Sequence, residues 1–270
     1  MTALPLLSVA VITFNEEKNI RACISSVVDL ADEIIVLDSF SADQTQAICQ
    51  QFAKVKFFQH AFDGHIPQKN RALGHCSGAW ILSLDADERL SPELHNSIKK
   101  FLASEPKVNG AKFPRLTYHL NKYIRHTGWY PNARFRLIRN GTATWGGENP
   151  HDTLIVQGST STLQGDLIHY SFVDLSDQIN TVNKFSTIKA FTRFAKGQRF
   201  SMFRMLFKPL SKFIELYLVK RGFLDGLPGF IIAVSSTFSA FLVEAKIYEL
   251  DKLKLQRISN LPASYSKPLE

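Results

Sequence analysis

The stretch ILSLDADERLSPEL, residues 81–94, leaves an apolar, strand-like segment and enters a turn that carries three acids. The acids are Asp85, Asp87 and Glu88, and Ser91 with Pro92 then has the residue types that begin a helix. The stretch therefore predicts a buried strand, an acidic turn and a helix. Carboxylates at the end of a buried strand indicate either a solvated turn or a metal site.

The preceding residues repeat the same strand–helix unit. Asn15 is expected to cap the first helix, with Glu16 and Glu17 in its first turn. Strands that alternate with helices at this spacing predict a parallel sheet with right-handed crossovers. The expected strands are residues 6–13, 33–39, 55–60 and 79–85, and the expected later helices follow Asp43, span 67–76 and follow Ser91.

Polar side chains fall at the carboxyl ends of these strands. Asn15 and Glu16 follow the first strand, Asp38 ends the second, and Asp85 with Asp87 ends the fourth. Sheets of this kind bind ligands at that edge. Two carboxylates at positions i and i+2 can share one divalent cation, which can also bridge the phosphates of a nucleotide. A D-x-D by itself is common, but its place after a buried strand favours the metal interpretation.

The pattern changes from about Gly110. Alternating segments at 110–120, 133–140 and 153–163 predict an antiparallel extension of the sheet with long loops. After Ser176 the chain becomes helical and basic. We therefore expect three parts, residues 1–108, 109–175 and 176–270.

Composition limits the class of protein. The 270 residues can bury a sizeable core, and three isolated cysteines fit a reducing compartment. The apolar N-terminal segment lacks a basic region and a cleavage site, so it is interpreted as the first strand. The net charge of +8 is concentrated between Thr181 and Asp225, which contains ten Lys and Arg but only two acids. Such a segment could face nucleic acid or an anionic membrane, or be a solvated helix face.

Two C-terminal segments suggest that the protein associates with a membrane. Residues 226–243 are apolar and uncharged over the 18 residues at which a spanning helix becomes possible, yet they also fit a buried or an interfacial helix. Residues 200–223 interleave Phe, Met, Leu and Tyr with Arg and Lys, which is typical of an interfacial helix beside anionic lipid. We expect a cytoplasmic protein that binds peripherally to the inner face of the cytoplasmic membrane.

Five motifs in order give the chain a family resemblance. VITFNEE (11–17), ADEIIVLDSFSADQT (31–45), QKNRAL (68–73), WILSLDADE (80–88) and GWYPNARFRLIRN (128–140) together resemble an inverting family 2 glycosyltransferase of the GT-A fold. Within that family the chain is similar to the lipopolysaccharide-core β-glucosyltransferases, and the resemblance covers most of its length. It implies an α/β fold with a mostly parallel, Rossmann-like sheet, in which 1–108 binds the nucleotide-sugar and 109–175 binds the acceptor.

The resemblance also implies a donor site. Thr13 and Phe14 match the positions that flank and stack on uracil, and Asp38 matches the acid that binds the base. Asp87 matches the main ligand of Mg²⁺ or Mn²⁺, and His169 matches a further metal ligand or a loop support, although a lone histidine at a strand end is often structural. The full expected donor set is Thr13, Phe14, Asn15, Glu16, Asp38, Lys69, Arg71, Asp85 and Ala86.

An inverting transfer needs a base that takes the proton of the acceptor hydroxyl. The match in GGENPHDTL (146–154) is Asp152, with His151 beside it, where the family usually has Glu. Glu148 is the alternative base. The expected acceptor-binding residues are Trp129, Tyr130, Arg134 and Arg136.

The expected activity is metal-dependent transfer of a hexose, with glucose favoured, from a UDP-sugar to a lipid-linked saccharide such as the lipopolysaccharide inner core. A polyprenyl phosphate is the alternative acceptor. A nucleotidyltransferase would need a Gly-rich basic loop after the first strand, where TFNEEKN offers acids. A nucleic-acid-binding protein would leave the strand-end acids without a role, so the expected partners are UDP-sugar, glycolipid and anionic membrane, and no nucleic acid.

Overall fold

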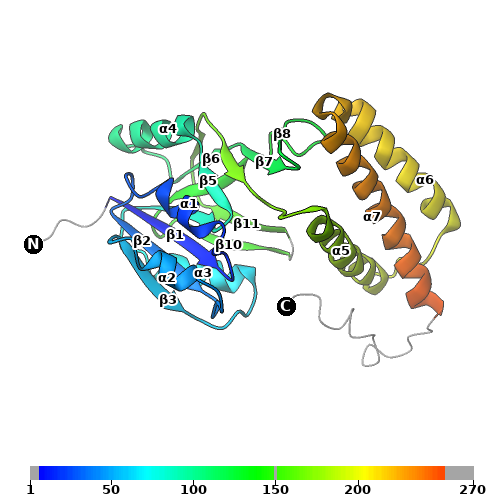
Figure 1. Ribbon diagram of the computed structural model, residues 1–270, viewed down its shortest axis with the longest axis horizontal. Helices are drawn as coiled ribbons and strands as arrows, with labels where there is room; N and C mark the ends of the chain where they lie inside the picture. Colours follow the sequence, from blue (N-terminus) through cyan, green and yellow to red (C-terminus); the bar gives the residue numbers. More distant parts are fainter. Residues whose placement is uncertain (1–5, 149–150, 253–270) are drawn as a thin grey trace, which may run out of the picture. The chain divides into compact units, whose positions relative to one another are not determined.

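The computed structural model describes residues 6–148 and 151–252, without the side chains of residues 148 and 151 (Figure 1). The chain forms two compact units. The first comprises Met1–Leu116 and Pro131–Tyr170, and the second comprises Thr117–Tyr130 and Ser171–Glu270. The expected assignment of donor and acceptor roles to 1–108 and 109–175 is functional and stays a prediction.

The first unit is built on a seven-stranded sheet with the order β12-β6-β9-β4-β1-β2-β3. Strand β1 is parallel to β2 and β4, and β2 is parallel to β3, whereas β9 runs antiparallel to both β4 and β6. The predicted parallel sheet with an antiparallel extension is confirmed. The strands are β1 (Leu7–Thr13), β2 (Glu33–Asp38), β3 (Val55–Gln59), β4 (Trp80–Asp85), β6 (Gly110–Phe113), β9 (Arg134–Arg139) and β12 (Thr160–Thr162).

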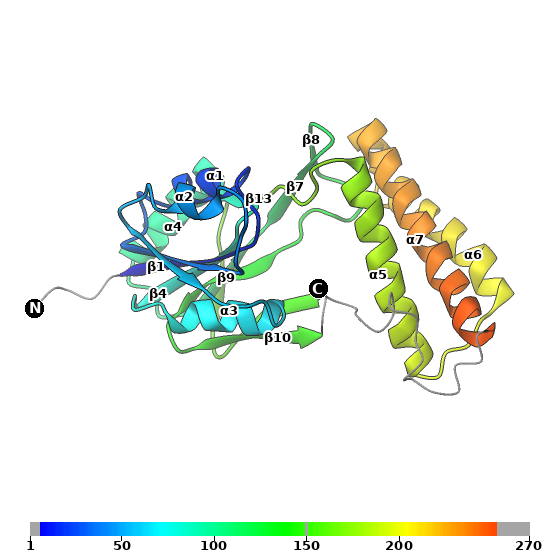
Figure 2. The same cartoon turned by 60° about the horizontal axis from the view of Figure 1, so that its bottom comes forward.

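Both faces of the central strands are covered, which explains their continuous apolar runs. Val9 and Val11 pack in one core cluster with residues of α1 (Ile20–Ser25) and α4 (Pro92–Ala103), and Ala10 packs in a second cluster. That second cluster includes Ala72 of α3 (His65–Gly74) and Trp145 of the antiparallel pair β10 (Ala143–Glu148) and β11 (His151–Val156). Figure 2 shows α3 and β10 on one side of the sheet and α1, α4 and α2 (Thr45–Cys49) on the other.

Helix α4 begins where the opening stretch predicts. The side chain of Ser91 accepts a hydrogen bond from the backbone N–H of Leu94, and Pro92 occupies the first turn, where its missing N–H costs nothing. Leu94, Ile98 and Leu102 are buried. The turn before α4 contains β5 (Glu88–Leu90), which pairs antiparallel with β13 (Leu167–His169).

The predicted cap at Asn15 is wrong. Helix α1 begins only at Ile20, and Asn15 has a left-handed backbone with φ of 54°. Its side-chain oxygen accepts from the N–H of Ala42, and its own N–H donates to the hydroxyl of Ser41. Asparagine tolerates this conformation, and the neighbouring loop supplies the partners that a helix turn would have supplied. The loops after β1 and β2 are thereby joined.

The second unit is mainly helical, as the sequence predicts after Ser176. Strand β7 (Arg115–His119) enters it and pairs with β8 (Lys122–Ile124). The helices are α5 (Leu175–Ala195), α6 (Met202–Phe213), the π-helix η1 (Ile214–Val219), the 3₁₀ helix η2 (Gly222–Asp225) and α7 (Leu227–Lys252). Helix α7 packs along both α5 and α6 (Figure 2). Of the described helices, α7 is long and apolar enough to cross a membrane by length and composition.

Candidate active site

The side chain of Lys69 joins two acids at the carboxyl edge of the sheet. Lys69 lies on α3, and its Nζ is 2.9 Å from Oδ1 of Asp85 at the end of β4. The same Nζ is 2.7 Å from Oδ2 of Asp152 on β11. Lys69 is only 5% exposed, so these contacts form with little competition from water. The structure thus brings together an expected donor-site acid and the expected base.

Arg136 holds Asp85 from the other side. Its Nη2 is 2.9 Å from Oδ2 of Asp85 and 2.6 Å from Oε1 of Glu88, which is fully buried. Burial alone would raise the pKa of Asp85, but the charges of Lys69 and Arg136 hold it well below its usual range. Burial alone would lower the pKa of Arg136, and the charges of Glu88 and Asp85 raise it instead. Asp85 is therefore a fixed carboxylate between two cations.

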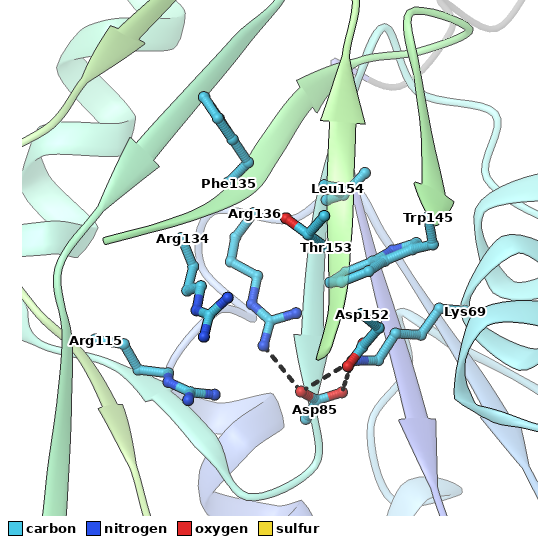
Figure 3. A pocket seen from close by; sticks show the side chains of 10 residues that line it. All are labelled: Lys69, Asp85, Arg115, Arg134, Phe135, Arg136, Trp145, Asp152, Thr153 and Leu154. Atoms are coloured by element: carbon cyan, nitrogen blue, oxygen red, sulfur yellow. Dashed lines mark hydrogen bonds and ion pairs between the residues drawn. The ribbon is translucent and has the colours of Figure 1, made fainter. Parts of the chain in front are cut away.

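These groups line a pocket of about 100 Å³, which Figure 3 shows from close by. The indole of Trp145 forms one wall, with Nζ of Lys69 4.3 Å and the guanidinium carbon of Arg136 5.1 Å from the ring centre. Cations at these distances are attracted by the π face. The lining residues are Lys69, Asp85, Arg115, Arg134, Phe135, Arg136, Trp145, Asp152, Thr153 and Leu154.

The two expected metal ligands lie together. In the pairing of β5 with β13, His169 stands opposite Glu88, and its Nε2 is 3.2 Å from Oδ2 of Asp87. The backbone N–H of Tyr170 donates to the carbonyl of Asp87 and fixes the turn. Among the described residues, no hydrogen-bond partner reaches the buried Oδ1 of Asp87 or the buried Nδ1 of His169. A buried carboxylate oxygen without a partner is costly, so this atom is suited to receive a ligand.

The donor set at this place fits a hard divalent cation. Carboxylate oxygen is the usual protein ligand of Mg²⁺ and Mn²⁺, imidazole nitrogen is a ligand of transition metals, and Mg²⁺ is commonly held by one or two carboxylates together with substrate phosphates. Within residues 6–148 and 151–252 no group of three His, Cys, Asp or Glu side chains is arranged to hold a metal by itself. Asp87 and His169 would therefore hold a metal only together with ligands from a bound nucleotide or water.

The end of β1 and the loop after it hold further expected donor residues. Phe14 is 57% exposed, so it is not a core aromatic, and the Oγ1 of Thr13 is buried with no partner in the described part of the chain. Burial and the nearby charges of Asp87, Asp43 and Asp85 raise the pKa of Glu16, against a hydrogen bond from Asn19. Phe14 is thus free to stack on a planar ligand.

Two of the other expected donor residues, Asp38 and Arg71, have local partners, and a third, Ala86, is buried. Asp38 is fully buried, and its carboxylate accepts from the N–H and the hydroxyl of Ser41 and from the side chain of Gln59. Arg71 pairs with Asp63 at 2.9 Å, outside the set of residues that lines the pocket. Ala86 is buried between the two acids of the D-x-D. Asp38 therefore fixes the second loop in this structure.

The remaining expected residues divide between the units. Arg134 and Arg136 line the pocket of the first unit. Trp129 and Tyr130 belong to the second unit, where Trp129 packs beside His119 and Phe172. Glu148 and His151 are paired in the backbone register of β10 and β11, but their side chains lie outside the described residues.

Several residues of the pocket were not predicted from the sequence. Arg115 and Trp145 line the pocket, and the buried Glu88 forms ion pairs with two of its arginines, Arg115 and Arg136. Glu88 directly follows the D-x-D and was named among the acids of that turn, but it was given no role at the site. Arg115 stands in the predicted alternating segment 110–120, Trp145 lies between two such segments, and no local feature distinguishes either from other arginines and aromatics.

An acid pair at the carboxyl edge of a mostly parallel sheet, beside a cation-lined pocket, defines an α/β protein with a ligand site suited to anionic groups. The sequence comparisons then identify the family. The chain belongs to glycosyl transferase family 2, whose profile matches residues 8–161, and it is a glycosyltransferase. The GT-A fold expected from the motifs is confirmed.

Relatives match over nearly the whole chain. The lipopolysaccharide core biosynthesis glycosyltransferase LpsC of Rhizobium meliloti is 32% identical over 92% of this chain and 94% of its own length. An uncharacterized glycosyltransferase of Rickettsia typhi is 30% identical over 90% of this chain and 87% of its own length. Both matches include the C-terminal helices as well as the sheet.

Solved structures are more distant. TarS 1–349 of S. aureus in complex with UDP-GlcNAc is 13% identical, with a TM-score of 0.48 over 92% of each chain. Glucosyl-3-phosphoglycerate synthase of Mycobacterium tuberculosis with Mn²⁺ and UDP-glucose is 24% identical, with a TM-score of 0.35 over 42% of this chain and 44% of its own. At these scores the family assignment rests on the sequence matches.

Proposed function

We propose that this glycosyltransferase transfers a hexose, with glucose favoured, from a UDP-sugar to a lipid-linked saccharide such as the lipopolysaccharide inner core, with inversion and with Mg²⁺ or Mn²⁺ bound. The observation that carries the proposal is the pairing of Asp87 with His169, where Asp87 follows by two residues the Asp85 that lines a pocket together with Asp152. The relation to LpsC, which covers nearly the whole chain, supports the acceptor class.

The metal would be held by Asp87 and His169 and would stabilise negative charge on the leaving diphosphate. Asp85 stays ionised between Lys69 and Arg136 and keeps the turn of the D-x-D in place. Phe14, exposed after β1, offers its ring to the uracil. These residues bind and orient the donor.

Asp152 is the proposed base. Its carboxylate takes the proton of the acceptor hydroxyl while that oxygen bonds to the anomeric carbon, and the bond from this carbon to the UDP oxygen breaks on the opposite face. The ammonium of Lys69, 2.7 Å from Asp152, orients the carboxylate between strand β11 and helix α3. Glu148 remains the alternative base.

Calorimetric titration tests the donor site. UDP and a panel of UDP-sugars are titrated with and without Mn²⁺ into the wild type, Asp87→Ala and the matched control Glu93→Gln, whose side chain is exposed on α4. The proposal requires metal-dependent binding that Asp87→Ala loses and Glu93→Gln keeps, and the rank of the sugars then identifies the donor. Absence of binding to every uridine nucleotide would contradict the proposal.

The acceptor is tested by transfer of labelled sugar. Lipopolysaccharide inner core and a polyprenyl phosphate are offered in parallel, because both are lipid-linked and anionic. Label on the inner core supports the proposal. Label on the polyprenyl phosphate alone would establish the alternative.

Membrane binding is proposed through α6. Its residues Phe203, Leu206, Phe207 and Leu210 follow helical spacing and are 52–69% exposed, and no residue of α6 is buried. Lys208 and Lys212 lie on the same helix and remain partly exposed. An exposed apolar helix face flanked by cations fits the surface of an anionic bilayer.

Helix α7 is proposed to support α6 and not to cross the bilayer. Glu244 of α7 is fully buried and lies 3.1 Å from Arg204 and 3.9 Å from Lys208. Lys246 donates to Asn183, Ser186 and Thr187 of α5. The charged side chains of α7 thus contact both α5 and α6. We infer from these contacts that α7 is packed within the second unit and is not exposed to lipid on all sides.

Vesicle co-sedimentation at low salt tests this role. The double variant Leu206→Asp/Phe207→Asp should lose binding to anionic vesicles, whereas Val173→Asp, at a residue 71% exposed, should retain it. If the double variant bound as the wild type does, the role of α6 would be rejected. A shift from dimer to monomer in that variant, without any vesicle binding by the wild type, would identify a second copy as the partner.

A further inference from the structure

The pocket beside Asp152 contains more cations than acids. Four basic side chains line it, against Asp85 and Asp152. Two of the four are neutralised, since Lys69 contacts both acids and Arg136 contacts Asp85 and the buried Glu88. The other two are Arg115 and Arg134.

Arg134 has no acid at ion-pair distance among the described residues. It stands two residues before Arg136 on β9, next to an irregularity in the pairing of β9 with β6, and Figure 3 shows both guanidinium groups in the pocket. Its Nε is buried, and no described residue accepts from it. Burial and the positive charges of Arg115 and Arg136 lower the pKa of Arg134, against the charges of Asp152 and Glu88, although an arginine stays protonated. Arg134 is therefore a partly desolvated cation that an anionic ligand can neutralise.

Arg115 faces the same space from β7. Its Nη1 is 3.6 Å from Oε1 of Glu88, an oxygen that already accepts from Arg136 at 2.6 Å. The Nε of Arg115 is buried and unpaired within the part of the chain that the structure describes. Arg115 thus keeps most of its hydrogen-bond donors for a ligand.

We propose that Arg115 and Arg134 form an anion-binding subsite for a phosphate or carboxylate group of the acceptor. Two guanidinium groups present planar pairs of N–H donors that match the oxygens of such an anion. Thr153, which follows Asp152 on β11, also lines the pocket and adds a hydroxyl. Arg136, expected from the sequence to share this role, is occupied by Asp85 and Glu88.

The position of the subsite indicates that the anion it binds belongs to the acceptor. The subsite shares its pocket with Asp152, the proposed base, which must touch the acceptor hydroxyl. Lys69 and Asp85 of the expected donor set also line this pocket, but each is already ion-paired, and the proposed metal ligands Asp87 and His169 are not among its lining residues. This inference rests on the proposed function, and the donor diphosphate is the other source of an anion with the same chemistry.

The test measures two ligands on the full-length protein. Inorganic phosphate is titrated without metal, and UDP is titrated with Mn²⁺, into the wild type, Arg115→Gln, Arg134→Gln and the double variant. Arg139→Gln is the matched control, because Arg139 lies on the same strand β9 but contacts the carbonyl of Pro106 and the ring of Trp80. Thermal melting establishes that each variant is folded, and Arg115→Lys with Arg134→Lys replaces any that is not.

The subsite predicts that phosphate affinity falls about tenfold or more in the glutamine variants and not in Arg139→Gln, while UDP affinity stays within about twofold. An equal loss of UDP affinity would overturn the assignment to the acceptor and give the two arginines to the donor diphosphate. Unchanged phosphate affinity, or none in the wild type, would overturn the subsite itself. If the wild type bound phosphate but no uridine nucleotide, the proposed function would fail while the subsite stood.

Discussion

The ammonium of Lys69 lies 2.7 Å from the carboxylate of Asp152, although the two residues are 83 positions apart in the chain. The contact joins α3 to β11 across the carboxyl edge of the sheet, and it places the proposed base next to the first acid of the D-x-D. Lys69 was expected to bind the donor, whereas in the structure it also orients the base.

Replacing Lys69 by Gln should lower the transfer rate by about a hundredfold, because Asp152 would lose the charge that fixes its position. Transfer of labelled sugar under saturating donor measures the effect. Lys99→Gln, at an exposed residue of α4, should leave the rate unchanged. Equal rates in the two variants would mean that the ion pair has no part in catalysis.

Asp152→Asn should reduce kcat by about 10²- to 10⁴-fold, since an amide cannot take the acceptor proton. The affinity for UDP, measured by calorimetry, should change little. Glu148→Gln separates the two candidate bases. If Glu148→Gln abolished turnover while Asp152→Asn remained active, Glu148 would be the base.

His169→Ala should weaken the Mn²⁺-dependent part of UDP affinity by about 10- to 100-fold, because the metal would lose one of its two proposed protein ligands and Asp87 would lose the side chain that contacts its Oδ2. Titrations with and without Mn²⁺ isolate that part. His95→Ala on α4 serves as the control. A loss of UDP affinity that was the same without metal would assign His169 a structural role.

Glu88→Gln should destabilise the folded protein by about 1–3 kcal/mol, because the buried Arg136 loses one of its two acidic partners and keeps only Asp85. Urea unfolding followed by circular dichroism gives the change in the free energy of unfolding. Glu93→Gln, the same substitution at an exposed position, should change it by less than about 0.5 kcal/mol. Similar values for the two variants would show that the Arg136–Glu88 pair adds no stability.

Glu33 should make stability depend on pH. Burial would raise its pKa, but hydrogen bonds from Lys56, Ser8 and Ser77 lower it to about 2. A folded pKa below the unfolded one gives stability that is fully present above about pH 5 and is lost as the pH falls toward 2, on the order of 3 kcal/mol. Urea unfolding at several pH values should show a flatter dependence for Glu33→Gln than for the wild type. Parallel curves would contradict this.

Much of the fold could be predicted because its signals are local. The apolar runs of the parallel strands and the cap at Ser91 predict elements that the structure contains. Asn15 shows the limit, since its partners Ser41 and Ala42 come from another loop and no helix forms there. The candidate site follows the same division: the strand-end acids were predicted, and Arg115 and Trp145 were not.

By itself the sequence determined the order of strands and helices and the place of Asp85 and Asp87, because alternating units put strand ends at one edge of a sheet. Only the tertiary structure decided which charges are neutralised. Nothing in the local sequence distinguishes Arg134 from Arg136. In the structure both line the pocket, but only Arg136 is paired with Asp85 and Glu88. The strength of a charge interaction depends on distance and desolvation, and for these residues both are set by strands brought together from distant parts of the chain.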